Sequence, residues 1–204
     1  SDFTLTTSTF NAISPILFSR EKKDNKYFLN IKQQIEITFL LALAGVFISP
    51  IAIELLLPEV YFSQIKIVPI LLLGLAFASS ASVVTTIFDV NERKDLNLKG
   101  IIVGTVVNII LNIILIPDFG TLGAAYSMLV AGFIWFLSNL FFTRKFNFDL
   151  RGLITTILFV CLIVFGHFVL WKFTFIYDLL GIVFFLAVSY RAYFVFKNII
   201  SFNT

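Results

Sequence analysis

The feature that most constrains this chain is a series of apolar runs, each about long enough to cross a lipid bilayer. They cover residues 1–19, 33–57, 65–88, 98–116, 122–142, 153–171 and 175–196. A spanning helix needs about 20 predominantly apolar residues, and in lipid every backbone polar group must find its partner within the protein. We therefore expect an all-α, polytopic transmembrane helical bundle of about seven spans.

The composition excludes a soluble globular domain. Of the 204 residues 59% are hydrophobic and only 13% are charged, and the mean hydropathy is +0.98. A net charge of +3 would elsewhere suggest a nucleic-acid partner. Here the basic residues lie between the apolar runs, so they indicate membrane orientation, and we expect no nucleic-acid partner.

The charged connectors predict the orientation of the chain. Thirteen of the 15 Lys and Arg residues lie in connectors 20–32, 89–99 and 143–151, at their edges or near the C-terminus. The positive-inside rule then places these connectors and the C-terminus in the cytoplasm and Ser1 outside. The chain begins without Met and without a signal-peptide pattern, so we interpret it as part of a larger protein.

Small and amide residues recur at every fourth position of the span 98–116. They are Gly100, Gly104, Asn108 and Asn112, which this spacing places along one face of a helix. Small residues let a second helix backbone approach closely, and an amide in hydrocarbon needs a hydrogen-bond partner. We expect the two Asn side chains to bond a neighbouring helix; the alternative is contact with a polar substrate.

A short turn follows this helix. Pro117 is expected to end the helix, and Asp118 and Gly120 supply turn residues. A second small-residue row follows on the return helix at Gly123, Ser127 and Ala131. The whole stretch predicts a helical hairpin that packs inside a membrane bundle, with Gly120 and Gly123 among its packing residues.

The first span carries a patterned polar face. Its members follow steps of three and four residues: Thr4, Thr7, Ser8, Asn11, Ser14 and Pro15. This spacing is typical of one helix face that lines a water-filled cavity. The alternative is that these hydroxyl and amide groups bond their own backbone or a neighbouring helix.

No catalytic or metal-binding constellation appears in the sequence. His167 is the single histidine and Cys161 the single cysteine, so neither a histidine ligand set nor an internal disulfide can form. There is no Ser-His-Asp set and no carboxylate pair at membrane depth. We expect no metal, no cofactor and no enzymatic activity.

Several motifs together resemble a known family. In order they are SPILFSREKKD, SPIAIELLLPEVY, IFDVNERKD, an N-x-x-x-N pair and IPDFGTLGAA. This arrangement resembles the C-terminal half of bacterial polysaccharide flippases, the O-antigen and capsule repeat-unit flippases of the multidrug/oligosaccharidyl-lipid/polysaccharide exporter superfamily. The resemblance covers about residues 11–142, and the block 108–125 is its most specific part.

The resemblance implies a function and a place in a larger fold. Members have 12 to 14 spans in two lobes around a central cavity, and they move polyprenyl-pyrophosphate-linked oligosaccharides across the bacterial cytoplasmic (inner) membrane. Residues 1–204 would form the C-terminal transmembrane lobe, and membrane lipids and an N-terminal lobe absent from this sequence would be its partners. Basic cavity residues meet the pyrophosphate in the family, and here only Arg20 stands at an inner mouth.

Three functions are compatible with this sequence, and a flippase is the first of them. Thr7, Asn11, Ser14 and Arg20 are expected to contact a lipid-linked oligosaccharide that is moved by alternating access. A drug or small-molecule antiporter of the same superfamily would require a titratable carboxylate at membrane depth. A membrane-embedded glycan polymerase or glycosyltransferase would require catalytic acids or a long external loop.

The orientation can be tested with single cysteines in a background that lacks Cys161 and every other cysteine. Asp118→Cys should react with an impermeant thiol reagent added to intact cells, because the turn is expected outside. Lys94→Cys should react only after the membrane is opened. Equal labelling of both from outside would reject the orientation.

Overall fold

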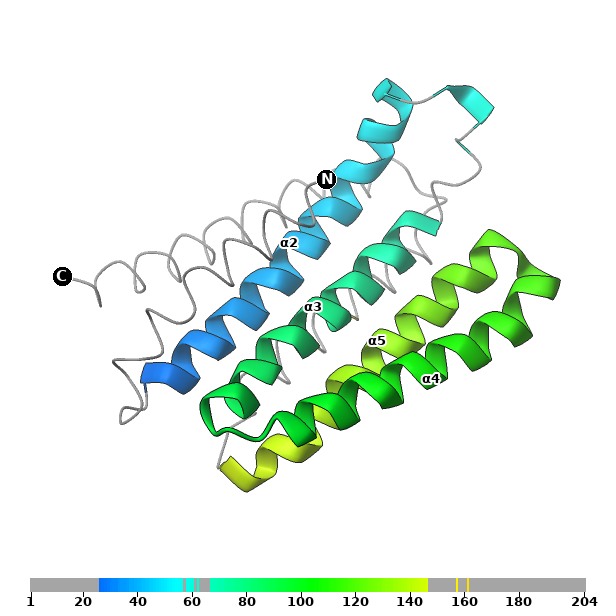
Figure 1. Ribbon diagram of the computed structural model, residues 1–204. Helices are drawn as coiled ribbons and strands as arrows, with labels where there is room; N and C mark the ends of the chain where they lie inside the picture. Colours follow the sequence, from blue (N-terminus) through cyan, green and yellow to red (C-terminus); the bar gives the residue numbers. More distant parts are fainter. Residues whose placement is uncertain are drawn as a thin grey trace.

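The structure, a computed structural model, describes residues 26–56, 58–60, 62 and 67–146 and the single positions 157 and 161. Its long helices are α2 (Lys26–Leu56), α3 (Val68–Val90), α4 (Lys94–Phe119) and α5 (Thr121–Thr143), followed by the short 3-10 turn η2 (Arg144–Phe146) (Figure 1). Within these ranges there is no strand, and the expectation of an all-α fold is confirmed for them.

Four of the expected seven spans fall within the described residues. Each of the four long helices is long and apolar enough to cross a membrane. The other three expected spans, 1–19, 153–171 and 175–196, lie outside the described residues except for positions 157 and 161. Helix α5 matches its expected range of 122–142 to within one residue at each end.

The charged connectors are shorter than expected. Helix α3 continues to Val90 and α4 already begins at Lys94, so the link between them is residues 91–93 rather than 89–99. Likewise α2 begins at Lys26, within the expected connector 20–32. Helices extend beyond the hydrocarbon wherever their backbone bonds continue, so charged residues can occupy a helix end in the polar headgroup region.

The turn between α4 and α5 also differs from expectation. Pro117 was expected to end the helix, but it lies inside α4, which continues to Phe119. A proline ring has a helical φ but removes one backbone bond and crowds the carbonyl four residues earlier, and α4 continues for only two residues beyond it. Gly120 alone makes the turn, with a positive φ of 56° and its N–H donating to the Ile116 carbonyl over 2.8 Å.

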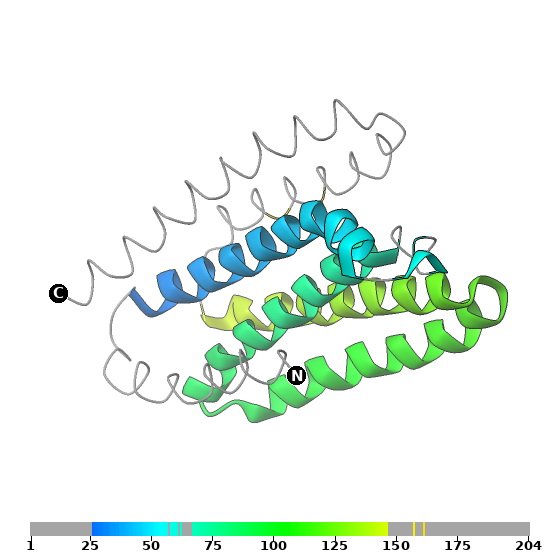
Figure 2. The same cartoon turned by 90° about the horizontal axis from the view of Figure 1, so that it is seen from above.

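The helices form a slanted bundle in which α3 and α5 are central. Figures 1 and 2 show α2 and α4 on opposite sides of this pair. Helix α5 packs extensively on both α3 and α4, whereas α3 and α4 touch only slightly. The chain reverses its direction before α4 and again after it, so α3 and α5 run in the same direction. Their contacts agree: Asn139 meets Ala81 and Gly132 meets Gly74, each pair 58 positions apart.

The backbones of α3 and α5 approach each other closely at Gly74 and Gly132. A methyl group added at Gly132 would lie 2.7 Å from the carbonyl oxygen of Gly74. One added at Gly74 would lie 3.0 Å from the Cα and N atoms of Leu129. Both obstacles are backbone atoms, so no side chain can move aside. Glycine at both positions is what lets the two helices touch.

Aromatic rings connect this pair to α2. The rings of Phe39 and Phe77 meet edge to face, with centroids 5.1 Å apart and planes at 79°. Phe136 of α5 lies 6.4 Å from Phe39 by the same measure. Such edge-to-face pairs contribute about 0.5–1.5 kcal/mol each beyond simple contact. All three side chains are buried, so they join α2, α3 and α5 in one core.

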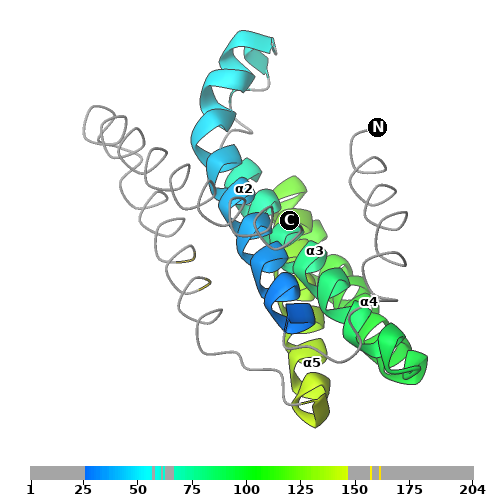
Figure 3. The same cartoon turned by 90° about the vertical axis from the view of Figure 1, so that its left-hand side faces the viewer.

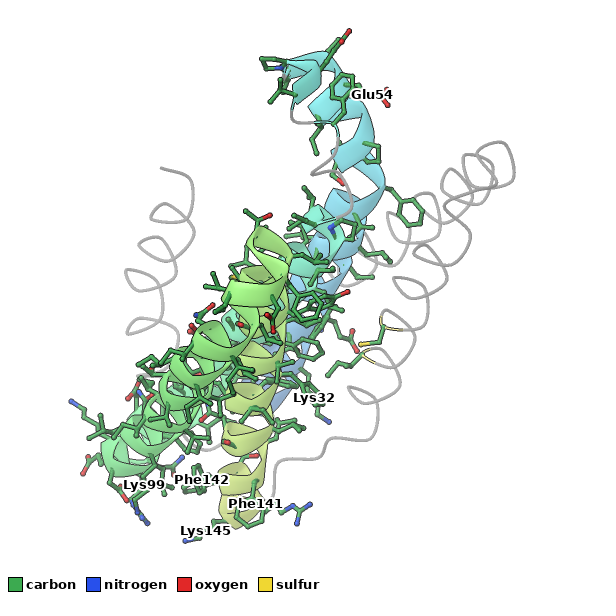
Figure 4. All side chains as sticks on the ribbon, turned by 90° about the vertical axis from the view of Figure 1, so that its right-hand side faces the viewer. Lys32, Glu54, Lys99, Phe141, Phe142 and Lys145 are labelled. Atoms are coloured by element: carbon green, nitrogen blue, oxygen red, sulfur yellow. The ribbon has the colours of Figure 1, made fainter. Side chains whose placement is uncertain are left out.

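The two ends of the bundle differ in charge. Figure 4 shows Lys32, Lys99 and Lys145 toward one end and Glu54 at the other. Helix α2 bends over its C-terminal part, as Figure 3 shows, and it contains Pro50, which removes a helical hydrogen bond there. The link between α3 and α4 and the turn η2 after α5 lie at the basic end of the bundle, as a common cytoplasmic side requires.

The α3–α5 contact predicts a sharp effect of a single methyl group. Gly132→Ala should lower the free energy of unfolding by about 1–3 kcal/mol, because its Cβ meets the Gly74 carbonyl and the helices must separate. Gly45→Ala is the control, since its Cβ meets only the flexible end of Leu72 at 3.1 Å. Unfolding in mixed detergent measures both, and equal losses would contradict a backbone contact as the tight point.

Candidate functional site

The residues predicted to bind substrate and those predicted to pack helices fall in different parts of the chain. Thr7, Asn11, Ser14 and Arg20 lie outside the described residues. The predicted packing residues all lie on α4, on α5 or in the turn between them: Gly100, Gly104, Asn108, Asn112, Gly120 and Gly123.

Gly100 and Gly104 receive side chains from α5. A methyl group at Gly100 would collide with Asn139 Oδ1, and one at Gly104 would lie 2.8 Å from Trp135 Cβ. As the position on α4 advances by four residues, the facing position on α5 falls by four. This is the register of two antiparallel helices, and each glycine provides the space that a larger α5 side chain occupies.

Asn139 is the polar residue that joins α5 to α3. It is fully buried, and its Nδ2 donates to the Ala81 carbonyl over 3.0 Å. Its Oδ1 has no conventional hydrogen-bond partner among the described residues and instead lies against the Cα of Gly100. A Cα–H group is a weak donor, and such contacts recur where helices meet closely. One side chain therefore touches three helices.

Gly123 closes the outer end of the hairpin. A methyl group there would collide with the Leu115 carbonyl oxygen. Ser127 donates its hydroxyl to the Gly123 carbonyl over 2.8 Å, so this hydroxyl is satisfied within α5. Gly120 has open space around its Cα, and its role is the positive-φ turn rather than helix packing.

Asn108 and Asn112 bond each other. Asn112 Nδ2 donates to Asn108 Oδ1 over 2.6 Å, a bond within α4 rather than the expected bond to a neighbouring helix. Both side chains are only half-buried. Within the described residues neither amide has a further hydrogen-bond partner, so an N–H₂ group of Asn108 and a carbonyl of Asn112 remain available.

A cavity of about 340 Å³ opens beside Asn108, where α3 and α4 diverge. Its floor is made by small residues of α3 and α5: Ala78, Ala131 and Gly132. Thr105 and Asn108 supply its polar groups, and Trp135 also lines it. The indole Nε1 of Trp135 is buried without a hydrogen-bond partner among the described residues. The cavity is thus lined mainly by apolar residues and has neutral polar groups on its α4 side.

Trp135 and Asn139 were not predicted from the sequence, although a signal for them was present. The row Gly123, Ser127 and Ala131 continues in the same step of four to Trp135, Asn139 and Thr143. Extending it would have placed all of them on the face that packs against α4. A row of small residues predicts close helix packing, and Trp135 and Asn139 are too large to belong to such a row.

Charged groups gather outside the membrane-spanning core. Arg93 donates from Nε to Asp95 at 2.9 Å, and this hydrogen bond and the carboxylate charge raise the pKa of Arg93 above its ordinary value. Arg144 lies 5.4 Å from the ring centre of Phe141. In the described part of the chain no cluster of His, Cys, Asp or Glu could hold a metal ion.

Comparison with known proteins supports the membrane assignment and adds no activity. The chain is 30% identical over 105 residues to a protein of Methanocaldococcus jannaschii that is described as an uncharacterized membrane protein. The matched region is 52% of this chain and 21% of that relative, so the chain spans about a fifth of its length. No family model and no solved structure matches. With four helices in its described part that are long and apolar enough to cross a membrane, the chain is a multi-pass helical membrane protein.

Replacing an asparagine that bonds another helix should cost more stability than replacing one that bonds its own helix. Asn139→Leu should lower the free energy of unfolding by about 0.6–2 kcal/mol, because it removes the bond to Ala81 and overfills the space at Gly100. Asn112→Leu loses only a bond within α4 and should cost clearly less. Unfolding in detergent compares them, and a larger loss for Asn112→Leu would restore the interhelical role first expected of it.

Proposed function

We propose that this chain is the C-terminal lobe of a flippase for polyprenyl-pyrophosphate-linked oligosaccharide repeat units, acting in O-antigen or capsule biosynthesis. The two lobes would rock about a central cavity and carry the glycan from the cytoplasmic to the outer leaflet. The proposal begins from the resemblance of the block 108–125, which is the hairpin that joins α4 to α5.

The observation that carries the proposal is the chemistry of the spans. No Asp, Glu, Lys or Arg occurs within residues 68–88, 100–117 or 121–143. The polar groups at these depths are amides, hydroxyls and an indole, among them Asn108, Thr105 and Trp135. Neutral donors and acceptors suit sugar hydroxyls, which both donate and accept hydrogen bonds. A pyrophosphate would instead meet Arg20 at the cytoplasmic mouth.

Packing supports a lobe that moves as one body. Gly74 and Gly132 bring α3 and α5 into backbone contact, and Asn139 joins α5 to both α3 and α4. Helices held at backbone distance cannot slide past one another without breaking these contacts. Rocking of intact lobes, as alternating access requires, suits such a unit better than separate helix movements.

The antiporter alternative is less well supported. It requires a titratable carboxylate deep in the membrane, and the acidic residue within the candidate span Ile31–Pro50 is Glu36. Glu36 lies four positions from Lys32, which Figure 4 places at the basic end of the bundle. A carboxylate one turn from that end is at the interface rather than at membrane mid-depth.

The proposal includes a location and partners. The protein would lie in the bacterial cytoplasmic membrane as a multi-pass protein with its C-terminus in the cytoplasm. Its N-terminal lobe, absent from this sequence, would complete the cavity and supply further anion-binding groups. Membrane lipids and the lipid-linked oligosaccharide would be the other partners.

Complementation tests this function in the full-length protein. In cells that lack their own glycan flippase, Asn11→Leu and Arg20→Ala should reduce surface polysaccharide and leave lipid-linked repeat units inside. Phe10→Leu, on the opposite face of the same predicted helix, is the matched control and should have little effect. Equal surface polysaccharide from all three variants would reject the assignment of the cavity.

A second outcome concerns the function itself. The unmutated full-length protein should restore surface polysaccharide for at least one of several glycans offered. Glu36→Gln should restore it as well, because no proton needs to bind that carboxylate. Failure of the unmutated protein with every glycan would reject the flippase, and loss with Glu36→Gln alone would favour the antiporter.

A further inference from the structure

One face of α4 differs chemically from the rest of that helix. Thr105, Asn108 and Asn112 lie within about 60° of one another around the helix axis. Val106 and Ile110 lie on the opposite side and are 47% and 50% exposed, as suits contact with lipid. The helix thus has an apolar outer side and an amide-bearing side, from which Thr105 and Asn108 line the cavity between α3 and α4 and Asn112 lies one turn further along.

Contact with lipid would be unfavourable for the amide-bearing side of α4. An asparagine side chain has two N–H donors and an acceptor oxygen. The single bond between Asn112 and Asn108 leaves donors and an acceptor of the pair without partners among the described residues. Unpaired amide groups in hydrocarbon are strongly unfavourable. Trp135 lines the same cavity, while its Nε1 atom is buried in the protein without a partner among the described residues.

Packing against α5 does not meet this need. Along the contact between α4 and α5, the side chain of Asn139 fills the space beside Gly100, and that of Trp135 fills the space beside Gly104. One turn further, at Asn108, this contact opens into the cavity of about 340 Å³. That volume lies in the range of roughly 300–1,000 Å³ that is usual for ligand sites. Its floor of Ala131 and Gly132 leaves the space unfilled by large side chains.

The groups around the cavity indicate the class of ligand. An ion would lack a counter-charge, since α4 has no charged residue between Lys99 and Asp118. An alkyl chain would leave the amides unpaired. A neutral polyhydroxylated chain can donate to Asn carbonyls, accept from the N–H groups and lie against the indole ring.

We propose that Thr105, Asn108, Asn112 and Trp135 line a water-filled part of the transport path and contact the hydroxyl groups of a neutral glycan. This inference rests on the proposed function and names contact residues for its substrate. It assigns α4 to the wall of the path, in addition to the predicted polar face of the first span.

Cysteine labelling tests the aqueous face. Thr105→Cys, Asn108→Cys and Asn112→Cys are made singly in the full-length protein without other cysteines, and Val106→Cys and Ile110→Cys are the matched controls. A charged, impermeant thiol reagent is applied to right-side-out and to inverted vesicles. Because thiols ionise poorly in apolar surroundings, the first set should react at least about tenfold faster than the controls from one side or both.

Two safeguards keep this test decisive. Thr105 is exposed, so Thr105→Cys changes a small side chain without removing a helix contact and reports even if an asparagine variant is unstable. Labelling of the amide-bearing side no faster than the controls would overturn the proposal. It would mean that another helix or lipid covers this side.

The glycan part has its own measurement. Labelling rates are compared in vesicles from cells that make the lipid-linked repeat unit and from cells blocked at its first sugar transfer. The repeat unit should slow labelling at Asn108→Cys severalfold, and an unchanged rate would overturn the glycan assignment. Failed complementation with fast labelling would reject the proposed function alone, whereas restored polysaccharide with unlabelled cysteines would reject this inference alone.

Discussion

Direct contact between helix backbones is the constraint on which the rest of this bundle depends. In a bilayer, association of helices gains little from hiding apolar surface, because lipid tails are as apolar as leucine. Close packing and a few hydrogen bonds must supply the stability instead. The glycine pair Gly74 and Gly132 brings α3 and α5 to that distance, and the rings of Phe39, Phe77 and Phe136 then hold α2 on the same pair.

The positions of these spans in the sequence were predictable, but the exact ends of their helices were predictable only for some of them. Hydropathy located α5 to within one residue at each end because its apolar run ends where its helix ends. It placed the start of α4 four residues late, at 98 rather than Lys94, because hydropathy marks the hydrocarbon and not the helix. Charged residues such as Asp95 and Lys99 continue the backbone bonds into the headgroup region.

The face of each helix was also predictable, but its partner was not. A step of four residues placed Asn108 and Asn112 on one side of α4, and they do share that side. Whether that side meets a helix depends on how α4 is rotated against α5, and a single sequence does not specify this rotation. The bond is therefore formed within α4, while Asn139, which continues the row Gly123, Ser127 and Ala131, makes the interhelical bond.

The hairpin of α4 and α5 is tightly packed near both of its ends, and the cavity beside Asn108 lies between these two packed regions. At the basic end Gly100 is closed by Asn139, and at the turn Gly123 lies against the Leu115 carbonyl. Between them α4 diverges from α3 and carries neutral amides beside an open cavity. Contacts at both ends hold α4 in place without filling its middle. A wall that is fixed at its ends and polar at its centre can take part in rigid-lobe movement and still present hydrogen-bonding groups to a passing polar chain.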